Sequence, residues 1–148
     1  MDLAIREAQK ADLEPLIELY MQLHGNRVPE FDERLELLWS GIIADRNHHI
    51  IVGTVDGRLV SSCALVVIPN LTHGQRPYAL IENVITHADY RKRGFATRLL
   101  RYARDLAELE NCYKIMLMTS SKDESTLSFY ERAGYNKNDK TAFIQWLD

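Results

Sequence analysis

Residues 78–107 of the chain read YALIENVITHADYRKRGFATRLLRYARDLA and contain two successive periodicities. Residues 78–86 have apolar flanks and a polar middle, which predicts a strand. From residue 96 the apolar positions recur at i, i+3, i+4, i+7, i+10 and i+11, the period of a helix with one buried face. CYKIMLMT at residues 112–119 returns to a strand pattern. Strand, helix and strand predict a right-handed crossover that makes the two strands parallel.

The segments before this unit predict more of the same sheet. Residues 3–8 alternate as a short strand, and Asp12 precedes a helical run. A weaker helical run follows Pro29 and is expected to end near Asp45. Residues 49–68 contain two β-branched runs joined by Asp56-Gly57, a dipeptide suited to a tight turn. We therefore expect a hairpin that leads into the strand at 78–86.

The segment after residue 119 predicts a short helix and a last strand. Ser121 and Glu124 have the spacing of a capping box, and Gly134 stands where a helix ends. AFIQWL at residues 142–147 has the composition of a final strand. No repeat or linker interrupts the pattern, so residues 1–148 are expected to form one domain.

Composition excludes several classes of protein. The net charge of −3 argues against general binding of polyanions, and apolar residues make up 46% of the chain. No apolar run reaches the roughly 18 residues of a membrane span, so no membrane association is expected. Cys63 and Cys112 stand in apolar contexts, typical of buried thiols in a reducing compartment. The cytoplasm is the expected location.

The stretch RKRGFAT, residues 91–97, is a candidate site for phosphate. The first turn of a helix presents unpaired N–H groups and the positive end of the helix dipole. Gly94 and the small Ala96 allow a phosphate to approach the backbone, and Arg91, Lys92 and Arg93 add positive charge. Taken alone, the motif also fits solvated charges ahead of an ordinary helix. It matches neither the dinucleotide fingerprint nor the P-loop.

The same basic stretch is a poor candidate for binding nucleic acid. Such sites interleave basic residues with aromatic side chains that stack on bases. Arg98, Arg101 and Arg104 instead lie on the helix face opposite the leucines, where they are expected to face water. His48-His49 lacks partners at metal-ligand spacing, so no metal site is expected either.

The second motif is SFYERAGY, residues 128–135, in the predicted short helix. Phe129 and Tyr130 could both be core residues. The order of the parts is more specific: a strand with a carboxylate, Arg-x-x-Gly-x-Ala before a helix, a strand, and a capped helix with Phe-Tyr. In this order, ENVITHADYRKRGFATRLL and STLSFYERAGY resemble the GNAT superfamily of acyl-CoA-dependent N-acyltransferases.

The resemblance implies an α/β fold of the α+β kind. Its central sheet is mixed and mostly antiparallel, with splayed parallel strands and about four flanking helices. It implies acetyl-CoA as co-substrate, with the pyrophosphate at the amides of residues 92–97 and the pantetheine arm beside Val84, Ile85 and Thr86. The implied cofactor-binding residues are Val84, Ile85, Thr86, Arg91, Lys92, Arg93, Gly94, Phe95, Ala96 and Thr97.

The implied reaction is direct acetyl transfer to a primary amine in a ternary complex. Tyr130 matches the family's residue that donates to the leaving thiolate. Proton transfer from a phenol with a pKa near 10 to the thiolate of a thiol with a pKa near 8.5 is unfavourable by about 2 kcal/mol. Glu82, expected to share a strand face with Val84 and Thr86, is the candidate base. At reference pKa values, removal of a proton from an alkylammonium by Glu82 is unfavourable by about 8 kcal/mol. Glu82 would therefore need a raised pKa, act through water, or accept the proton after attack.

Alternatives stay open for the base and for the function. His73 and His87 are other candidate bases, and Glu82 could instead pair with Arg76. Neither cysteine occupies an expected nucleophile position. The resemblance implies a small amine as acceptor, with amino sugar phosphates and aminophosphonates among the candidates. Arg27, His73, Arg76 and Lys122 could border its pocket and suit an anion, but solvation at the surface is the more common role for each. A non-catalytic CoA-binding regulatory module and a protein N-acetyltransferase are the competing functions, and a homodimer is compatible with each.

Overall fold

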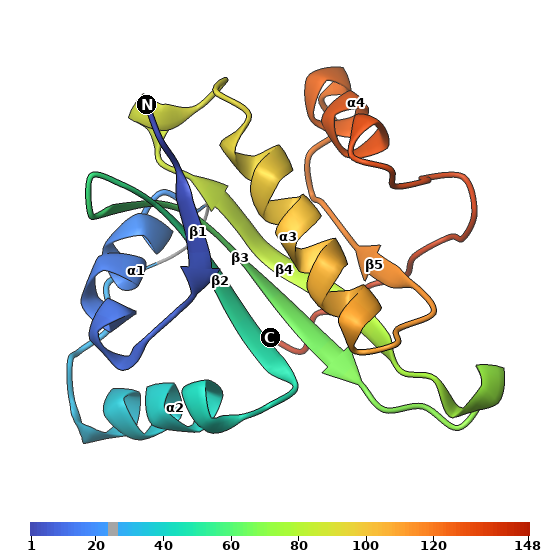
Figure 1. Cartoon of the computed structure of the whole chain (residues 1–148), viewed down its shortest axis with the longest axis horizontal. Coiled ribbons are helices and arrows are strands. Elements are labelled where there is room, and N and C mark those ends of the chain that lie inside the picture. Colours follow the sequence, from blue (N-terminus) through green and yellow to red (C-terminus); the bar gives the residue numbers. More distant parts are fainter. Residues whose placement is uncertain (24–26) are drawn as a thin grey trace. The chain divides into compact units, whose positions relative to one another are not determined.

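The computed structural model describes residues 1–23 and 27–148. The chain divides into two compact units, Met1–Met116 and Leu117–Asp148. The strands and α-helices, labelled in Figure 1, are β1 (Ala4–Glu7), α1 (Leu13–Tyr20), α2 (Glu33–Ala44), β2 (His48–Val55), β3 (Arg58–Ile68), β4 (Tyr78–Thr86), α3 (Phe95–Leu109), β5 (Ile115–Leu117) and α4 (Glu124–Arg132). Among the described residues, the short 3-10 helices are η1 (Lys10–Asp12), η2 (His73–Gln75) and η3 (Ala88–Tyr90).

The five strands form one sheet in the order β1-β2-β3-β4-β5. The first four strands pair antiparallel. At the start of β4, Tyr113 donates to the Pro77 carbonyl at 2.9 Å and Ala79 donates to the Lys114 carbonyl at 3.0 Å. From the first hydrogen bond to the second, the residue numbers increase on both segments, as they do in a parallel pair. The mixed sheet and the four α-helices of the described residues confirm the expected fold class.

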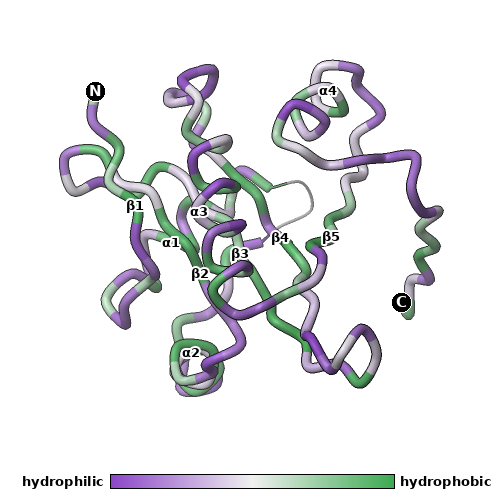
Figure 2. The backbone as a smooth tube through the Cα atoms, turned by 45° about the vertical axis from the view of Figure 1, so that its right-hand side comes forward, coloured by the Kyte–Doolittle hydropathy of each residue, from purple (hydrophilic) through white to green (hydrophobic). Residues whose placement is uncertain are grey.

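Helices pack against both faces of the sheet in the first unit. Leu16 and Trp39 of α1 and α2 form a buried cluster with Ile50 and Val52 of β2. On the opposite face, a Cβ added to Gly53 would lie 3.1 Å from Leu99 of α3, so glycine lets this helix approach the sheet closely. Figure 2 shows hydrophobic residues along the central strands, which are covered on both faces.

The hairpin and the strand after it form where the sequence predicts them. Asp56 and Gly57 have φ of 49° and 79°, the left-handed pair that a type I′ turn requires. β4 covers residues 78–86 and is exposed only at Glu82 and Asn83, so its polar middle is confirmed. Gly134 follows the C-cap of α4 at φ 103°, the expected place for a helix-ending glycine.

Three expectations for the second half of the chain are wrong. β5 has three residues rather than eight, because the Cys112 N–H donates to the Ala107 carbonyl and closes the end of α3. The capping box is absent, since the N-cap of α4 is Asp123, whose N–H donates to the Ser121 hydroxyl. Residues 142–147 form no strand: Phe143 and Trp146 are 91% and 80% exposed. An apolar pattern makes a strand only where another strand pairs its backbone.

Membrane-spanning helices were also considered. None of the helices among the described residues combines the length and the apolar character needed to cross a bilayer.

Candidate active site

A β-bulge in β4 lies at the centre of the candidate site. Ile85 pairs with Ser62 and Glu82 pairs with Ala64, so Asn83 and Val84 together oppose one residue of β3, Cys63. Asn83 has φ 55°, the left-handed conformation that asparagine tolerates better than most residues. The extra residue changes which way every later side chain of the strand points.

The bulge separates the side chains of Glu82 and Thr86. Glu82 pairs with Ala64, which belongs to the buried cluster beneath α1 and α2, and Ile85 belongs to the same cluster. Thr86 instead meets Ser61 through their hydroxyl oxygens at 2.8 Å, and Ser61 and Ala64 lie on opposite faces of β3. The expectation that one strand face carries Glu82, Val84 and Thr86 is therefore wrong. Glu82 lies on the α1 and α2 side.

The bulge also changes which backbone groups face the β5 edge of β4. Before it, the Ala79 N–H points to this edge, where it donates to Lys114. After it, the His87 N–H points to the other edge and donates to the Val60 carbonyl at 2.8 Å. Because backbone groups alternate along a strand, those of Val84 and Thr86 face the β5 edge. This is the edge that the predicted pantetheine arm requires.

The loop from Arg91 to Thr97, the candidate anion site, contains two residues with a left-handed backbone. Lys92 and Gly94 both have left-handed φ, at 62° and 78°, and α3 begins at Phe95. Phe95 is 4% exposed, so it fixes the start of the helix in the core. The first N–H groups of α3 have no acceptor within the helix. A Cβ at Gly94 would meet nothing within 4 Å, which leaves open space over these amides.

The arginines of this loop have different partners. Arg91 donates from Nε to the Thr86 carbonyl at 3.0 Å, which ties the loop to the end of β4. The Arg93 guanidinium lies 6.0 Å from the centre of the Tyr90 ring, and Arg58 approaches the same ring at 5.7 Å. The side chain of Arg91 therefore shapes the loop, while the exposed Lys92 adds charge above it.

A cavity of about 230 Å³ lies between α1, α2 and the sheet, and Asn83 of the bulge forms part of its wall. The lining residues are Leu13, Leu16, Ile17, Tyr20, Leu35, Leu38, Trp39, Ile42, His48, Ile50 and Asn83. Tyr20 is hydrogen-bonded to Ser62, and burial raises the pKa of its phenol. Tyr20, His48 and Asn83 are not among the site residues predicted from the sequence. Only Asn83 carried a signal, as the polar break in an otherwise apolar strand.

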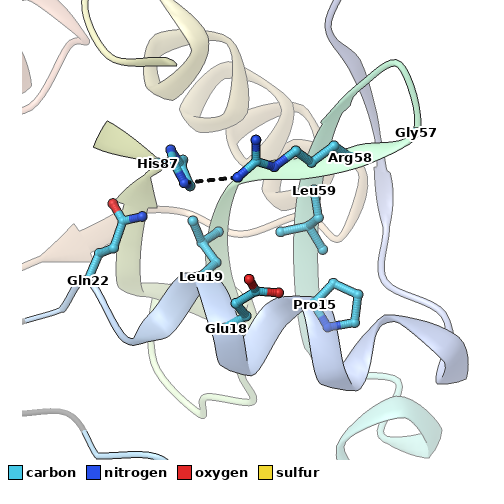
Figure 3. A pocket seen from close by; sticks show the side chains of 8 residues that line it. All are labelled: Pro15, Glu18, Leu19, Gln22, Gly57, Arg58, Leu59 and His87. Carbon is cyan, nitrogen blue, oxygen red and sulfur yellow. Dashed lines mark hydrogen bonds between the residues drawn. The ribbon is translucent and has the colours of Figure 1, made fainter. Parts of the chain in front are cut away.

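His87 lies in a different hollow, of about 250 Å³, between α1 and the start of β3 (Figure 3). Its Nδ1 accepts from the Asp89 N–H at 3.1 Å, and its Nε2 lies 3.2 Å from a guanidinium nitrogen of Arg58. One nitrogen is thus engaged by the backbone and the other faces a cation. These contacts disfavour His87 as the base.

The other predicted polar residues near β4 also have partners. His73 stacks on Tyr113 with ring centres 4.0 Å apart. Arg76 donates to the carbonyls of Asn111 and Cys112 at 3.1 and 3.0 Å rather than to Glu82. The alternative of a Glu82–Arg76 pair is therefore wrong, and Glu82 stays exposed. Among the described residues, no group of three or more His, Cys, Asp or Glu side chains could hold a metal ion.

The cysteines are unsuited to covalent catalysis. Cys63 is fully buried opposite the bulge, and burial raises its pKa to about 12. Burial also raises the pKa of Cys112. Because the thiolate is the nucleophile, both shifts oppose a route through an acetylated cysteine.

Tyr130 lies in α4, in the second unit. Its ring meets Phe129 edge-to-face at 5.0 Å between ring centres and Tyr135 at 6.4 Å. The Tyr135 N–H donates to the Tyr130 carbonyl at 3.0 Å, which closes the end of the helix. This aromatic group fixes the orientation of the phenol on α4.

The bulged strand β4 leads through the loop with Gly94 into α3, and comparison with known proteins identifies the family to which this arrangement belongs. The acetyltransferase (GNAT) family matches residues 13–135. The chain therefore belongs to the acetyltransferase (GNAT) family of acyltransferase enzymes, which use acetyl-CoA.

Individual relatives agree with this assignment. A glucosamine 6-phosphate N-acetyltransferase of Trypanosoma brucei brucei is 32% identical over 84 residues, 57% of this chain and 55% of the relative, so the match spans about half of that protein. A putative acetyltransferase from Agrobacterium tumefaciens str. C58 has a TM-score of 0.89 at 35% identity and covers 97% of this chain and 99% of its own. Glucosamine-6-phosphate N-acetyltransferase from Arabidopsis thaliana shares the fold, with a TM-score of 0.88 at 20% identity over 100% of both chains.

Proposed function

We propose that the chain is an N-acetyltransferase that moves the acetyl group of acetyl-CoA to the primary amine of a small molecule by direct attack in a ternary complex. One observation carries the proposal. The β4 bulge at Asn83 leads, through Thr86 and the Arg91 contact, into the amides of α3. The proposed thioester site and the proposed pyrophosphate site would then follow each other along one continuous stretch of backbone.

The cofactor would bind along this stretch. The pyrophosphate fits the open space over Gly94 and the first turn of α3, where unpaired amides and the helix dipole favour an anion. Arg91, Lys92 and Arg93 add positive charge. The pantetheine arm would then pair with backbone groups of Val84 and Thr86 at the β5 edge. The backbone of β4 and of the first turn of α3 would hold the cofactor, and acetyl-CoA supplies the activated acetyl group.

Three groups would assist the transfer. The amine nitrogen forms a bond to the thioester carbon, and a backbone N–H near Val84 polarises the carbonyl oxygen. Glu82 takes the proton of the amine through a water molecule or after attack. The tetrahedral intermediate then releases the CoA thiolate, which Tyr130 stabilises with a hydrogen bond or a proton. In this proposal, residues 1–148 act as one acyltransferase domain.

A thiol-release assay tests the proposal. Acetyl-CoA is incubated with the full chain and a panel of amino sugars, their phosphates, aminophosphonates, polyamines, arylalkylamines and peptides. We expect amine-dependent release of CoA thiol with at least one small amine. Thermal stabilisation by acetyl-CoA without release for any amine would instead support a CoA-binding regulatory module.

A further inference from the structure

The cavity between α1, α2 and the sheet lies on the side of β4 where an acceptor is needed. Asn83 of the bulge forms part of its wall, and Glu82, the next residue, points to the same side of the sheet. An amine seated in this cavity would therefore lie near both the proposed base and the proposed acetyl position. This step rests on the proposed function.

The wall of the cavity is apolar. Nine of the eleven described residues that line it are Leu, Ile, Tyr or Trp, and the other two are His48 and Asn83. None of these described lining residues is a lysine or an arginine. A phosphate needs charged or aligned N–H donors, because an anion that loses its water without them is strongly destabilised.

Of the four basic residues expected to suit an anion, three belong to this unit, and none of these three lines the cavity. Arg76 is bound to backbone carbonyls at the end of α3, and His73 is stacked on Tyr113. Arg27 is exposed, and it does not line the cavity. The expected anionic acceptor therefore has no cationic partner among the residues that form the described wall.

The size and opening of the cavity fit an apolar ligand. An apolar cavity of about 150 Å³ is enough to hold a benzene ring, and this one measures about 230 Å³. Leu38 lines it and is nevertheless 60% exposed, so its side chain stands where a ligand would cover it. A ligand that buries this side chain gains hydrophobic stabilisation that a sugar phosphate would not.

We propose that the acceptor is a primary amine carried on an apolar body, such as an arylalkylamine. The body would fill the cavity between α1 and α2, and the amine would point toward Asn83 and Glu82. His48 is the second polar group in the wall and offers a hydrogen bond to a polar substituent of the body.

A comparison of an apolar amine with two phosphorylated amines tests the proposal. Phenethylamine, glucosamine 6-phosphate and 2-aminoethylphosphonate are each assayed with saturating acetyl-CoA. We expect kcat/KM for phenethylamine to exceed that of both phosphorylated amines by about 10-fold or more, which is the effect expected when an apolar cavity buries one aromatic ring of the substrate. A preference for either phosphorylated amine would overturn the assignment of substrate class while leaving the acetyltransferase proposal intact.

Two neighbouring leucines of α2 provide a matched pair of variants. Leu37 and Leu38 are 67% and 60% exposed, but only Leu38 lines the cavity. We expect Leu38→Gln to lower kcat/KM for phenethylamine about 5- to 10-fold, and Leu37→Gln to change it less than about 2-fold. The KM for acetyl-CoA should change in neither variant. Equal losses in the two variants would contradict a role for the cavity.

If no amine is turned over, calorimetry of phenethylamine binding with CoA present distinguishes the proposed apolar cavity from the proposed acetyl transfer. Binding that the parent and Leu37→Gln show and Leu38→Gln loses would support the apolar cavity and refute acetyl transfer. No binding by the parent would overturn the inference. Sedimentation adds one more outcome: a parent dimer that Leu38→Gln alone dissociates would assign this surface to a second copy of the chain and overturn the inference.

Discussion

Glu82 and Thr86 lie on opposite faces of β4 although they are four positions apart in the chain. In a regular strand the two side chains would share a face. The bulge at Asn83 and Val84 adds one residue opposite Cys63, so Glu82 faces α1 and α2 while Thr86 meets Ser61 on the α3 side. The proposed base thus lies on the α1 and α2 face of β4, whereas the proposed pantetheine contacts are backbone groups at the β5 edge. An amine could then approach from that face and the thioester from the edge.

The bulge depends on a left-handed residue at position 83. Asn83→Gly should keep activity within about 3-fold, because glycine adopts φ 55° easily. Asn83→Val should lower the free energy of unfolding by about 1–2 kcal/mol and reduce kcat, because a β-branched residue resists this conformation. Urea unfolding and steady-state kinetics measure both effects. Equal activity in the two variants would mean that the bulge is not needed for transfer.

Glu82 is proposed to accept the proton of the amine. Glu82→Gln should lower kcat about 100-fold and remove the acidic limb of the pH profile of kcat/KM, while the KM for acetyl-CoA stays within about 2-fold. Glu36→Gln, a change of an exposed carboxylate on α2, serves as the control and should leave the profile unchanged. A Glu82→Gln enzyme with the parental profile would assign the proton to water or to another group.

Tyr130 is proposed to stabilise the leaving thiolate. Tyr130→Phe should lower kcat about 10- to 100-fold and alter the alkaline limb of its pH profile, because the phenylalanine keeps the ring contacts and loses only the hydroxyl. Tyr135→Phe, in the same aromatic group, should leave kcat unchanged. Kinetics across pH distinguish the two variants, and an unchanged Tyr130→Phe profile would make Tyr130 a packing residue.

The proposed pyrophosphate site depends on Gly94. Gly94→Ala and Gly74→Ala carry the same kind of strain, because both glycines have φ near 70–80° and neither added Cβ meets an atom within 4 Å. Each should lower the free energy of unfolding by about 1 kcal/mol. Only Gly94→Ala should weaken CoA binding, by about 10-fold, as measured by calorimetry. If both variants bind CoA like the parent, the anion site lies elsewhere.

The Arg6–Asp12 pair should make stability depend on pH. Arg6 donates to both carboxylate oxygens, at 2.6 and 3.0 Å, and these bonds hold the pKa of Asp12 below its usual value of 3.8. The stabilisation is complete above the unfolded pKa and is lost as pH falls through the lowered folded pKa. Asp12→Asn should therefore destabilise by about 1–2 kcal/mol at neutral pH.

Urea unfolding near pH 7 and near pH 2 checks this expectation. The difference between Asp12→Asn and the parent should shrink toward zero in acid. Glu108→Gln, which breaks the exposed Arg104–Glu108 pair at 3.3 Å, should change stability by less than about 0.5 kcal/mol at either pH. A difference for Asp12→Asn that persists in acid would assign its effect to packing rather than to charge.

Much of the fold could be predicted because local patterns determine it. The Asp56-Gly57 turn and the span of β4 follow from residues next to each other in the chain. The bulge could not be predicted in this way, since it depends on how two residues of β4 align with Cys63 across the sheet. The wrong face assigned to Glu82 follows directly from that missing information.

The candidate site, like the fold, could be predicted from the sequence only in part. The candidate anion site at Gly94 was predicted from the strand–loop–helix order, and the structure adds its left-handed backbone. The cavity was missed because Tyr20 and Trp39 have ordinary core spacing on two separate helices. These residues line a cavity only because of the way the two helices pack over the sheet. Helical periodicity carries no information about the packing of one helix against another.

The most direct measurement of the central claim is a rapid-mixing experiment that follows CoA thiol release, with mass spectrometry of the protein and the amine at each time point. Direct transfer in a ternary complex predicts that thiol appears only when an amine acceptor is present, with one acetylated amine formed per thiol and no acetylated protein. A burst of thiol without amine, matched by acetyl-protein, would contradict the account, as would the absence of amine-dependent release altogether.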